Sequence, residues 1–151
     1  MRISRKAEYA LRALTVMARK PAASSQIEEL ANAGHIPVKF LEQILLVLKR
    51  AGMLRSRRGV GGGYQLERTP DRITLGEVLT AVDGPFQPTS CTQPDPALAG
   101  RGKCECGVPG GCGMGRLFTE MQMQVNTFLQ NTTVADALAR ENAGPSMQFD
   151  I

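Results

Sequence analysis

The sequence is poor in the groups that most enzymes and membrane proteins need. It contains one histidine, His35, and no nucleophile paired with a base in any recognisable pattern, so an enzymatic role is not expected. No stretch approaches the roughly 20 consecutive apolar residues that cross a bilayer. No apolar signal-peptide segment follows the basic residues at the N-terminus. We therefore expect a cytoplasmic protein without a membrane partner.

Positive charge is concentrated in the first half of the chain. Residues 1–72 carry 14 Lys and Arg against 6 Asp and Glu, a net charge of +8, whereas residues 73–151 carry 4 against 8, a net charge of −4. A basic module joined to a mildly acidic body favours a polyanionic partner such as nucleic acid. A solvated basic face is the simpler alternative, because such faces occur in many soluble proteins.

Apolar residues at helical spacing predict three helices before residue 52. The first covers about residues 4–20. The second begins with a capping box of Ser25 and Glu28 and stops near Gly34. The third is opened by Pro37 and closed by Gly52. Its predicted buried stripe consists of Leu41, Ile44, Leu45 and Leu48, widened by Phe40 and Val47. Two helices joined by a short turn, the second polar outward, form a helix-turn-helix.

A basic hairpin with a glycine-rich tip is predicted directly after the third helix. Two extended runs, residues 53–58 and 64–66, flank the glycines of residues 59–63, and glycines let the backbone approach another surface closely. After a helix-turn-helix this hairpin is interpreted as a wing. A three-helix protein–protein module is the alternative. The predicted DNA-contacting residues are Ser25, Val38, Lys39, Glu42, Gln43, Arg50, Arg55, Arg57, Arg58 and Gly59.

The second half is predicted to hold a short helix, a loop, a long helix and a tail. Thr74 and Glu77 form a capping box that starts the short helix. Residues 84–112 hold six Gly and five Pro, so we expect a functional loop there. The long helix, about residues 114–130, carries a stripe too wide for a helix alone in water, and a second copy of it is the simplest partner. The stripe consists of Met114, Leu117, Phe118, Met121, Val125, Phe128 and Leu129.

These elements divide the chain into four predicted parts. Residues 1–83 form a winged helix-turn-helix, and residues 84–112 form a cysteine-bearing loop. Residues 113–140 hold the dimerisation helix and a short last helix that Thr133 begins, and residues 141–151 form a disordered tail.

All four cysteines, Cys91, Cys104, Cys106 and Cys112, lie within 22 residues. In a reducing compartment such a group favours metal or redox chemistry over disulfides. The spacing differs from the paired cysteines of zinc sites, and uneven thiolates in a glycine-rich loop suit an iron–sulfur cluster. The long helix starts directly after Cys112, and its N-terminal dipole would favour an anionic cluster. Zinc and a thiol–disulfide switch remain alternatives.

Several motifs together resemble the winged-helix iron–sulfur regulator family that includes IscR, NsrR and RirA. The resemblance covers roughly residues 1–135. It is carried by Met1-Arg-Ile-Ser with Tyr9-Ala-Leu-Arg12, Phe40-Leu-Glu-Gln43, Arg58-Gly-Val-Gly-Gly-Gly-Tyr64, Gly76-Glu-Val with Ala81-Val-Asp83, and Phe128-Leu before Asn131-Thr-Thr.

The resemblance implies a ligand set. In that family three loop cysteines bind the cluster, and Cys91, Cys106 and Cys112 match them, with five residues between the last two. Cys104 is extra, and is a bystander, an alternative ligand or a redox partner. The IscR type uses a histidine at the place of Gly115, whereas the NsrR type uses a carboxylate from the first helix of the other subunit, where this chain has Glu8. The resemblance therefore implies an NsrR-like site, with a 4Fe–4S cluster favoured over 2Fe–2S.

The expected protein is thus a mainly α, winged helix-turn-helix homodimer that binds double-stranded operator DNA as a repressor. Its expected signal is nitric oxide, oxygen or redox state, or the supply of iron or clusters. A zinc- or disulfide-stabilised DNA-binding protein without sensing is one alternative. An electron-transfer or cluster-carrier protein, in which the helix-turn-helix is only structural, is another.

Overall fold

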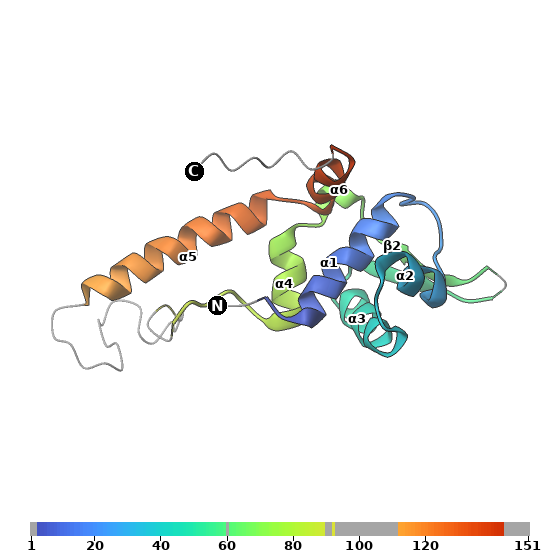
Figure 1. The fold of residues 1–151 in the computed structure, drawn as a ribbon, viewed down its shortest axis with the longest axis horizontal. Coiled ribbons are helices and arrows are strands. Elements are labelled where there is room, and N and C mark those ends of the chain that lie inside the picture. Colours follow the sequence, from blue (N-terminus) through green and yellow to red (C-terminus); the bar gives the residue numbers. More distant parts are fainter. Residues whose placement is uncertain (1–2, 60, 90–91, 93–111, 144–151) are drawn as a thin grey trace.

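The computed structural model describes residues 3–59, 61–89, 92 and 112–143, and it has the predicted mainly α architecture with one antiparallel hairpin (Figure 1). In chain order the described elements are α1 (Arg5–Ala18), α2 (Ile27–Gly34), α3 (Val38–Arg50), β1 (Leu54–Arg57), β2 (Gly63–Leu66), the 3-10 helix η1 (Pro70–Arg72), α4 (Leu75–Asp83), α5 (Gly113–Asn131) and α6 (Val134–Asn142).

Helix α1 lies at the centre of the core and packs against α2, α3, α4 and α6. Its Ala7, Ala10 and Ala13 are fully buried, and their small side chains let neighbouring helices approach closely. The predicted buried stripe of α3 is confirmed, since Leu41, Ile44, Leu45 and Leu48 are all fully buried. The two positions predicted to widen that stripe are not part of the core. Val47 is half-buried and Phe40 is 52% exposed.

The predicted starts of α2 and α3 were each wrong by one residue. Helix α2 begins at Ile27, and the backbone N–H of Gln26 donates to the Glu29 carboxylate at 3.2 Å, so the box lies one residue later than predicted. Ser25, the predicted cap, instead pairs through its backbone with Tyr64 in an antiparallel bridge. Pro37 precedes the helix as its cap residue, with extended backbone angles. The left-handed Gly52 after α3 is as predicted.

Gly63 joins the wing to the helix-turn-helix. In the hairpin Leu54 faces Leu66 and Arg57 faces Gly63. The N–H of Ser25 donates to the Tyr64 carbonyl, and the N–H of Tyr64 donates to the Ser25 carbonyl, both at 2.9 Å. Gly63 has a φ of 147°, and a Cβ there would lie 2.4 Å from the Ser25 carbonyl oxygen. The wing therefore attaches to the start of α2 through a position that only glycine fits.

We expect Gly63→Ala to destabilise the fold more than a glycine change at the wing tip. The new Cβ would collide with backbone, which cannot rotate away, so the cost should reach about 3 kcal/mol. Gly61 is the matched control, because it also has a positive φ but open space around it. Gly61→Ala should cost only about 1 kcal/mol of backbone strain. Urea denaturation measures both changes, and equal losses would show that the Ser25 contact is not tight.

Helix α6 packs on the body of the protein, whereas most of α5 projects away from it (Figure 1). Val134 and Leu75 donate backbone hydrogen bonds to the carbonyls of Ile73 and Thr132, at 2.9 and 2.8 Å, which joins the start of α6 to the start of α4. Helix α6 continues to Asn142, two residues into the segment that was predicted to be a disordered tail. Its Glu141 forms an ion pair with Arg19 of α1. Helix α5 packs on α4 near its C-terminal end and projects away from the body (Figure 1).

Candidate nucleic-acid interface and sensor residues

The predicted recognition surface of α3 is exposed as expected. The side that faces away from the core carries Val38, Lys39, Glu42, Gln43 and Arg50, and all five are exposed. The core leucines and Ile44 hold the opposite side against α1 and α2. This arrangement presents polar and cationic groups on a rigid helix, which is what reading base edges in a major groove requires.

The wing supplies the cations beside this helix. Arg55, Arg57, Arg58 and Gly59 are exposed. Arg55 is partly engaged, because its guanidinium donates to the Gln65 side chain at 3.0 Å and lies 3.8 Å from the Glu67 carboxylate. In the described part of the chain, Arg57 and Arg58 form no ion pair. These two guanidinium groups are therefore the wing cations best placed to meet phosphates.

Two further contacts position the wing, and sequence patterns did not reveal them. The Lys49 ammonium at the end of α3 donates to the Ser56 hydroxyl at 2.7 Å. The Gln65 amide donates to the Ala22 carbonyl at 2.7 Å, before α2. Ser25 is half-buried, with its backbone in the bridge to Tyr64, so its assignment as a DNA contact stays a prediction. The wing and α3 form one continuous surface because these contacts fix their relative position.

Glu8 lies at the start of a chain of contacts that leads to the helix-turn-helix. Its carboxylate accepts from Arg12 at 2.7 Å and from Arg5 at 3.4 Å. The Arg12 guanidinium also donates to the carbonyl of Gly34 at 3.3 Å, and lies 5.6 Å from the centre of the Tyr9 ring. Tyr9 in turn makes an edge contact with Phe40 of α3. These contacts connect the Glu8 carboxylate, through Arg12, to the turn between α2 and α3.

Of the four cysteines, the structure describes Cys112. Cys91, Cys104 and Cys106 lie outside the described residues, and Cys112 is the half-buried residue that caps α5. The Cys112 side chain makes no capping hydrogen bond to the first turn of α5, and among the described residues nothing lies within 4 Å of a Cβ built at Gly113. The amide N–H groups of this first turn lie beside the thiol, and the positive end of the helix dipole would favour an anion there, which fits thiolate ligation of an anionic cluster. Among the described residues, no three His, Cys, Asp or Glu side chains gather as metal ligands.

A second junction connects the start of α1 to the end of α4. The backbone N–H of Ser4 donates to the Asp83 carboxylate at 3.1 Å, and the Ser4 hydroxyl donates to its other oxygen. The same hydroxyl accepts from the Ala7 N–H and so caps α1. Asp83 is the last residue of α4 and directly precedes the cysteine-bearing loop. The start of that loop is therefore attached to the helix that carries Glu8.

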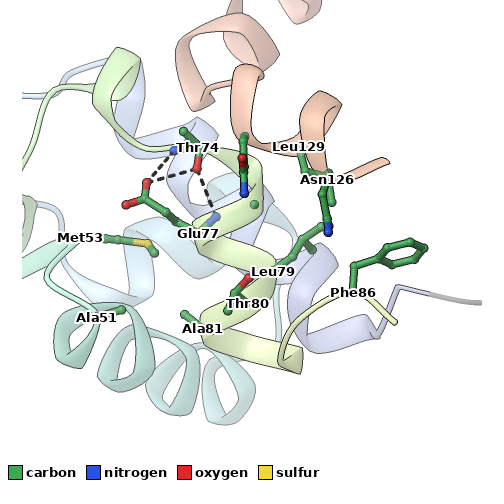
Figure 2. A pocket seen from close by; sticks show the side chains of 12 residues that line it. Ala51, Met53, Thr74, Glu77, Leu79, Thr80, Ala81, Phe86, Asn126 and Leu129 are labelled. Carbon is green, nitrogen blue, oxygen red and sulfur yellow. Dashed lines mark hydrogen bonds between the residues drawn. The ribbon is translucent and has the colours of Figure 1, made fainter. Parts of the chain in front are cut away.

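A pocket of about 390 Å³ lies between α4, α5 and the end of α3 (Figure 2). Met53, Leu79, Phe86 and Leu129 form its apolar walls. Among the described residues that line it, Glu77 is the one titratable side chain. Burial raises the pKa of Glu77, but the Thr74 N–H and the Arg68 guanidinium lower it by more, so the pKa lies below its usual value. Glu77 thus caps α4, and the described residues that line the pocket do not form a catalytic constellation.

No helix in the part of the chain that the structure describes has the length and apolar character needed to span a membrane.

Comparisons with known proteins agree with this geometry. The model of the Rrf2 family, described as an iron-dependent transcriptional regulator, matches residues 3–140. An rrf2-like helix-turn-helix transcriptional regulator of Rhodobacter capsulatus is 32% identical over 98% of this chain and 99% of its own length. The transcriptional regulator IscR of Sodalis glossinidius is 31% identical over 93% of this chain and 81% of its own. These similar proteins are regulators and not enzymes.

The solved structures include regulators of the same architecture. CymR, the global cysteine regulator of B. subtilis, superposes with a TM-score of 0.74 at 25% identity, over 93% of this chain and 98% of its own.

Proposed function

The chain belongs to the Rrf2 family of DNA-binding transcriptional regulators, and from this premise we propose that it is a repressor whose operator binding depends on an iron–sulfur cluster. The observation that carries the proposal is the combination of an exposed recognition surface on α3 with a cysteine at the N-terminus of α5. In this proposal residues 1–83 bind DNA, residues 84–112 hold the cluster and residues 113–140 join two subunits.

Cys91, Cys106 and Cys112 would hold the cluster, with Glu8 of the second subunit as the fourth ligand. When bound, the cluster supplies a redox- and ligand-sensitive iron centre. Helix α5 carries Cys112 away from the body that contains α1 (Figure 1), which favours a carboxylate contributed by another copy over Glu8 of the same chain. A carboxylate is a harder and more labile ligand than a thiolate, so it would leave one iron corner open to nitric oxide or oxygen.

The chain's own contacts suggest how such a site would affect DNA binding. Glu8 and Arg12 now form an ion pair at 2.7 Å, and ligation would compete with Arg12 for the carboxylate. Arg12 also holds the Gly34 carbonyl and lies over Tyr9. Weakening or restoring the Glu8–Arg12 pair would therefore shift the turn between α2 and α3, and with it the recognition helix. Two recognition helices must lie about one DNA turn apart, roughly 34–36 Å, to bind two half-sites.

Anaerobic purification followed by metal analysis tests the proposal. We expect iron and acid-labile sulfide in equal amounts, an absorption band of bound cluster, and operator affinity that differs between the loaded and the stripped protein. The four cysteines of the chain also suit one alternative, a regulator that works through its thiols without a cluster. Stoichiometric zinc, or a metal-free protein whose operator affinity follows thiol oxidation, would exclude the cluster proposal.

The wing gives a separate prediction on DNA binding. Arg58→Ala should weaken operator binding, and the slope of log affinity against log salt should become shallower by about one unit, because one phosphate contact is lost. Fluorescence anisotropy over a salt series measures both quantities. Arg140→Ala is the matched control, since it removes an exposed arginine from α6. If the two variants behave alike, the wing tip does not contact the DNA.

A further inference from the structure

Leu46 is an exposed leucine in the middle of the polar side of α3. Its neighbours in sequence, Ile44, Leu45 and Leu48, are fully buried, whereas Leu46 is 47% exposed. It does not extend the buried stripe, because it lies on the side of the helix that faces away from the core. The fold therefore gains little from an apolar side chain at this position. A single exposed leucine is ordinary in itself, and this one becomes informative through its place on the recognition surface of α3.

The position of Leu46 on the helix points to DNA as that partner. Lys39, Glu42, Gln43 and Leu46 are spaced i, i+3, i+4 and i+7, so they form one row along the helix. The groove-reading helix of homeodomains presents its base-contacting residues at the same spacing. Lys39 lies at one end of the row. Arg50 lies at the other end, one turn beyond Leu46, and both cations are exposed. Cations at both ends suit a polyanion better than the apolar surface of another protein.

We propose that Leu46 reads a thymine 5-methyl group in the major groove of each operator half-site. Among the base edges in that groove, the thymine methyl is the one apolar group. A leucine can bury this methyl, whereas it can satisfy no donor or acceptor of guanine, cytosine or adenine. Each half-site should therefore contain one thymine whose methyl group contributes to affinity, beside the bases that Lys39 and Gln43 contact. This inference depends on DNA binding by α3, and adds to it one specificity-determining residue.

The experiment removes the methyl from the DNA and its partner from the protein. A duplex is first selected from a random library with the full-length protein, and each thymine is then replaced singly by uracil, which lacks only the methyl. For the unmodified protein, uracil at one position of each half-site should weaken binding about fourfold, the value of one buried methyl group. For Leu46→Ala, the thymine duplex should bind more weakly, and uracil at that position should cause no further loss.

Two variants serve as controls. Leu46→Met keeps an apolar side chain and should keep the sensitivity to uracil. Met123→Ala truncates another exposed apolar residue, on α5, and should leave both affinities unchanged. The inference is overturned if every uracil duplex binds as tightly as its thymine parent. It is also overturned if the losses from uracil and from Leu46→Ala add, or if Leu46→Ala weakens binding to all duplexes equally. A protein that selects no sequence at all would refute the function of α3 itself, a result distinct from these.

Discussion

Alanine at Cys91, Cys106 or Cys112 is expected to abolish cluster loading, whereas alanine at Cys104 should leave it largely intact. Each of the first three thiolates would hold one iron corner, and a corner without its protein ligand is lost to solvent. Iron and sulfide analysis of anaerobically purified variants, with absorption and circular dichroism spectra, measures the loading. The four substitutions are matched in type and lie in one region of the chain. If Cys104 proves as necessary as Cys106, the site has four thiolates and Glu8 has no part in it.

The experiment on Glu8 has to separate two roles, because its carboxylate already pairs with Arg12. Glu8→Ala would remove both a ligand and the acceptor of the Arg12 hydrogen bond at 2.7 Å. Glu8→Gln keeps an acceptor for Arg12 but offers iron only a weak neutral ligand. We expect both variants to release their iron several times faster than the unmodified protein when exposed to oxygen. Arg12→Ala separates the two roles. If it accelerates iron release as much as Glu8→Gln does, Glu8 acts through Arg12 and not as a ligand.

The sequence predicted those features that depend on local periodicity. The buried stripe of α3 follows from apolar residues three and four apart, and Leu41, Ile44, Leu45 and Leu48 are buried for that reason. The capping box of α4 was predicted because Thr74 and Glu77 lie three residues apart and satisfy each other locally. The wing was predicted because glycines separate two extended runs.

The features that the sequence predicted wrongly or did not predict involve partners distant in the chain. Ser25, the predicted cap of α2, instead pairs with Tyr64, which lies 39 positions later in the chain. The contact between Ser4 and Asp83 joins residues 79 positions apart, and neither residue carries a local signal for it. Phe40 belongs to an apolar run, but it lies at the edge of α3 beside Tyr9 and remains mostly exposed. Helical periodicity cannot distinguish such an edge position from the centre of the buried face.

The apolar stripe predicted on the long helix divides into two rows in the structure. Phe118, Val125 and Leu129 are half-buried, and Leu129 lines the pocket between α5 and α4. Met114, Leu117, Met121 and Phe128 are exposed and form a second row along the helix. A helix that projects from the body with such a row would lose free energy in water unless another surface covered it. The same row on a second copy is self-complementary, as a two-fold interface requires.

Lysine at both Leu117 and Met121 is therefore expected to convert a dimer into monomers. Each dimer would have to bury four unpaired charges, and at about 2 kcal/mol or more for each the association should weaken by several orders of magnitude. Sedimentation velocity at micromolar protein measures the change. Operator affinity should fall with it, because a monomer binds only one half-site at a time.

Met123→Lys is the matched control for this experiment. Met123 is 56% exposed on the same helix, but at 100° per residue it lies about 160° around the axis from Met121. The same charge at this position should leave the dimer intact. If Met123→Lys dissociates the dimer as readily as the double variant, charge on α5 in general weakens the assembly and the exposed row is not its seam. A dimer that survives the double variant with unchanged operator affinity would place the interface on another surface of the chain, and α5 would then need a different partner for the four residues of its exposed row.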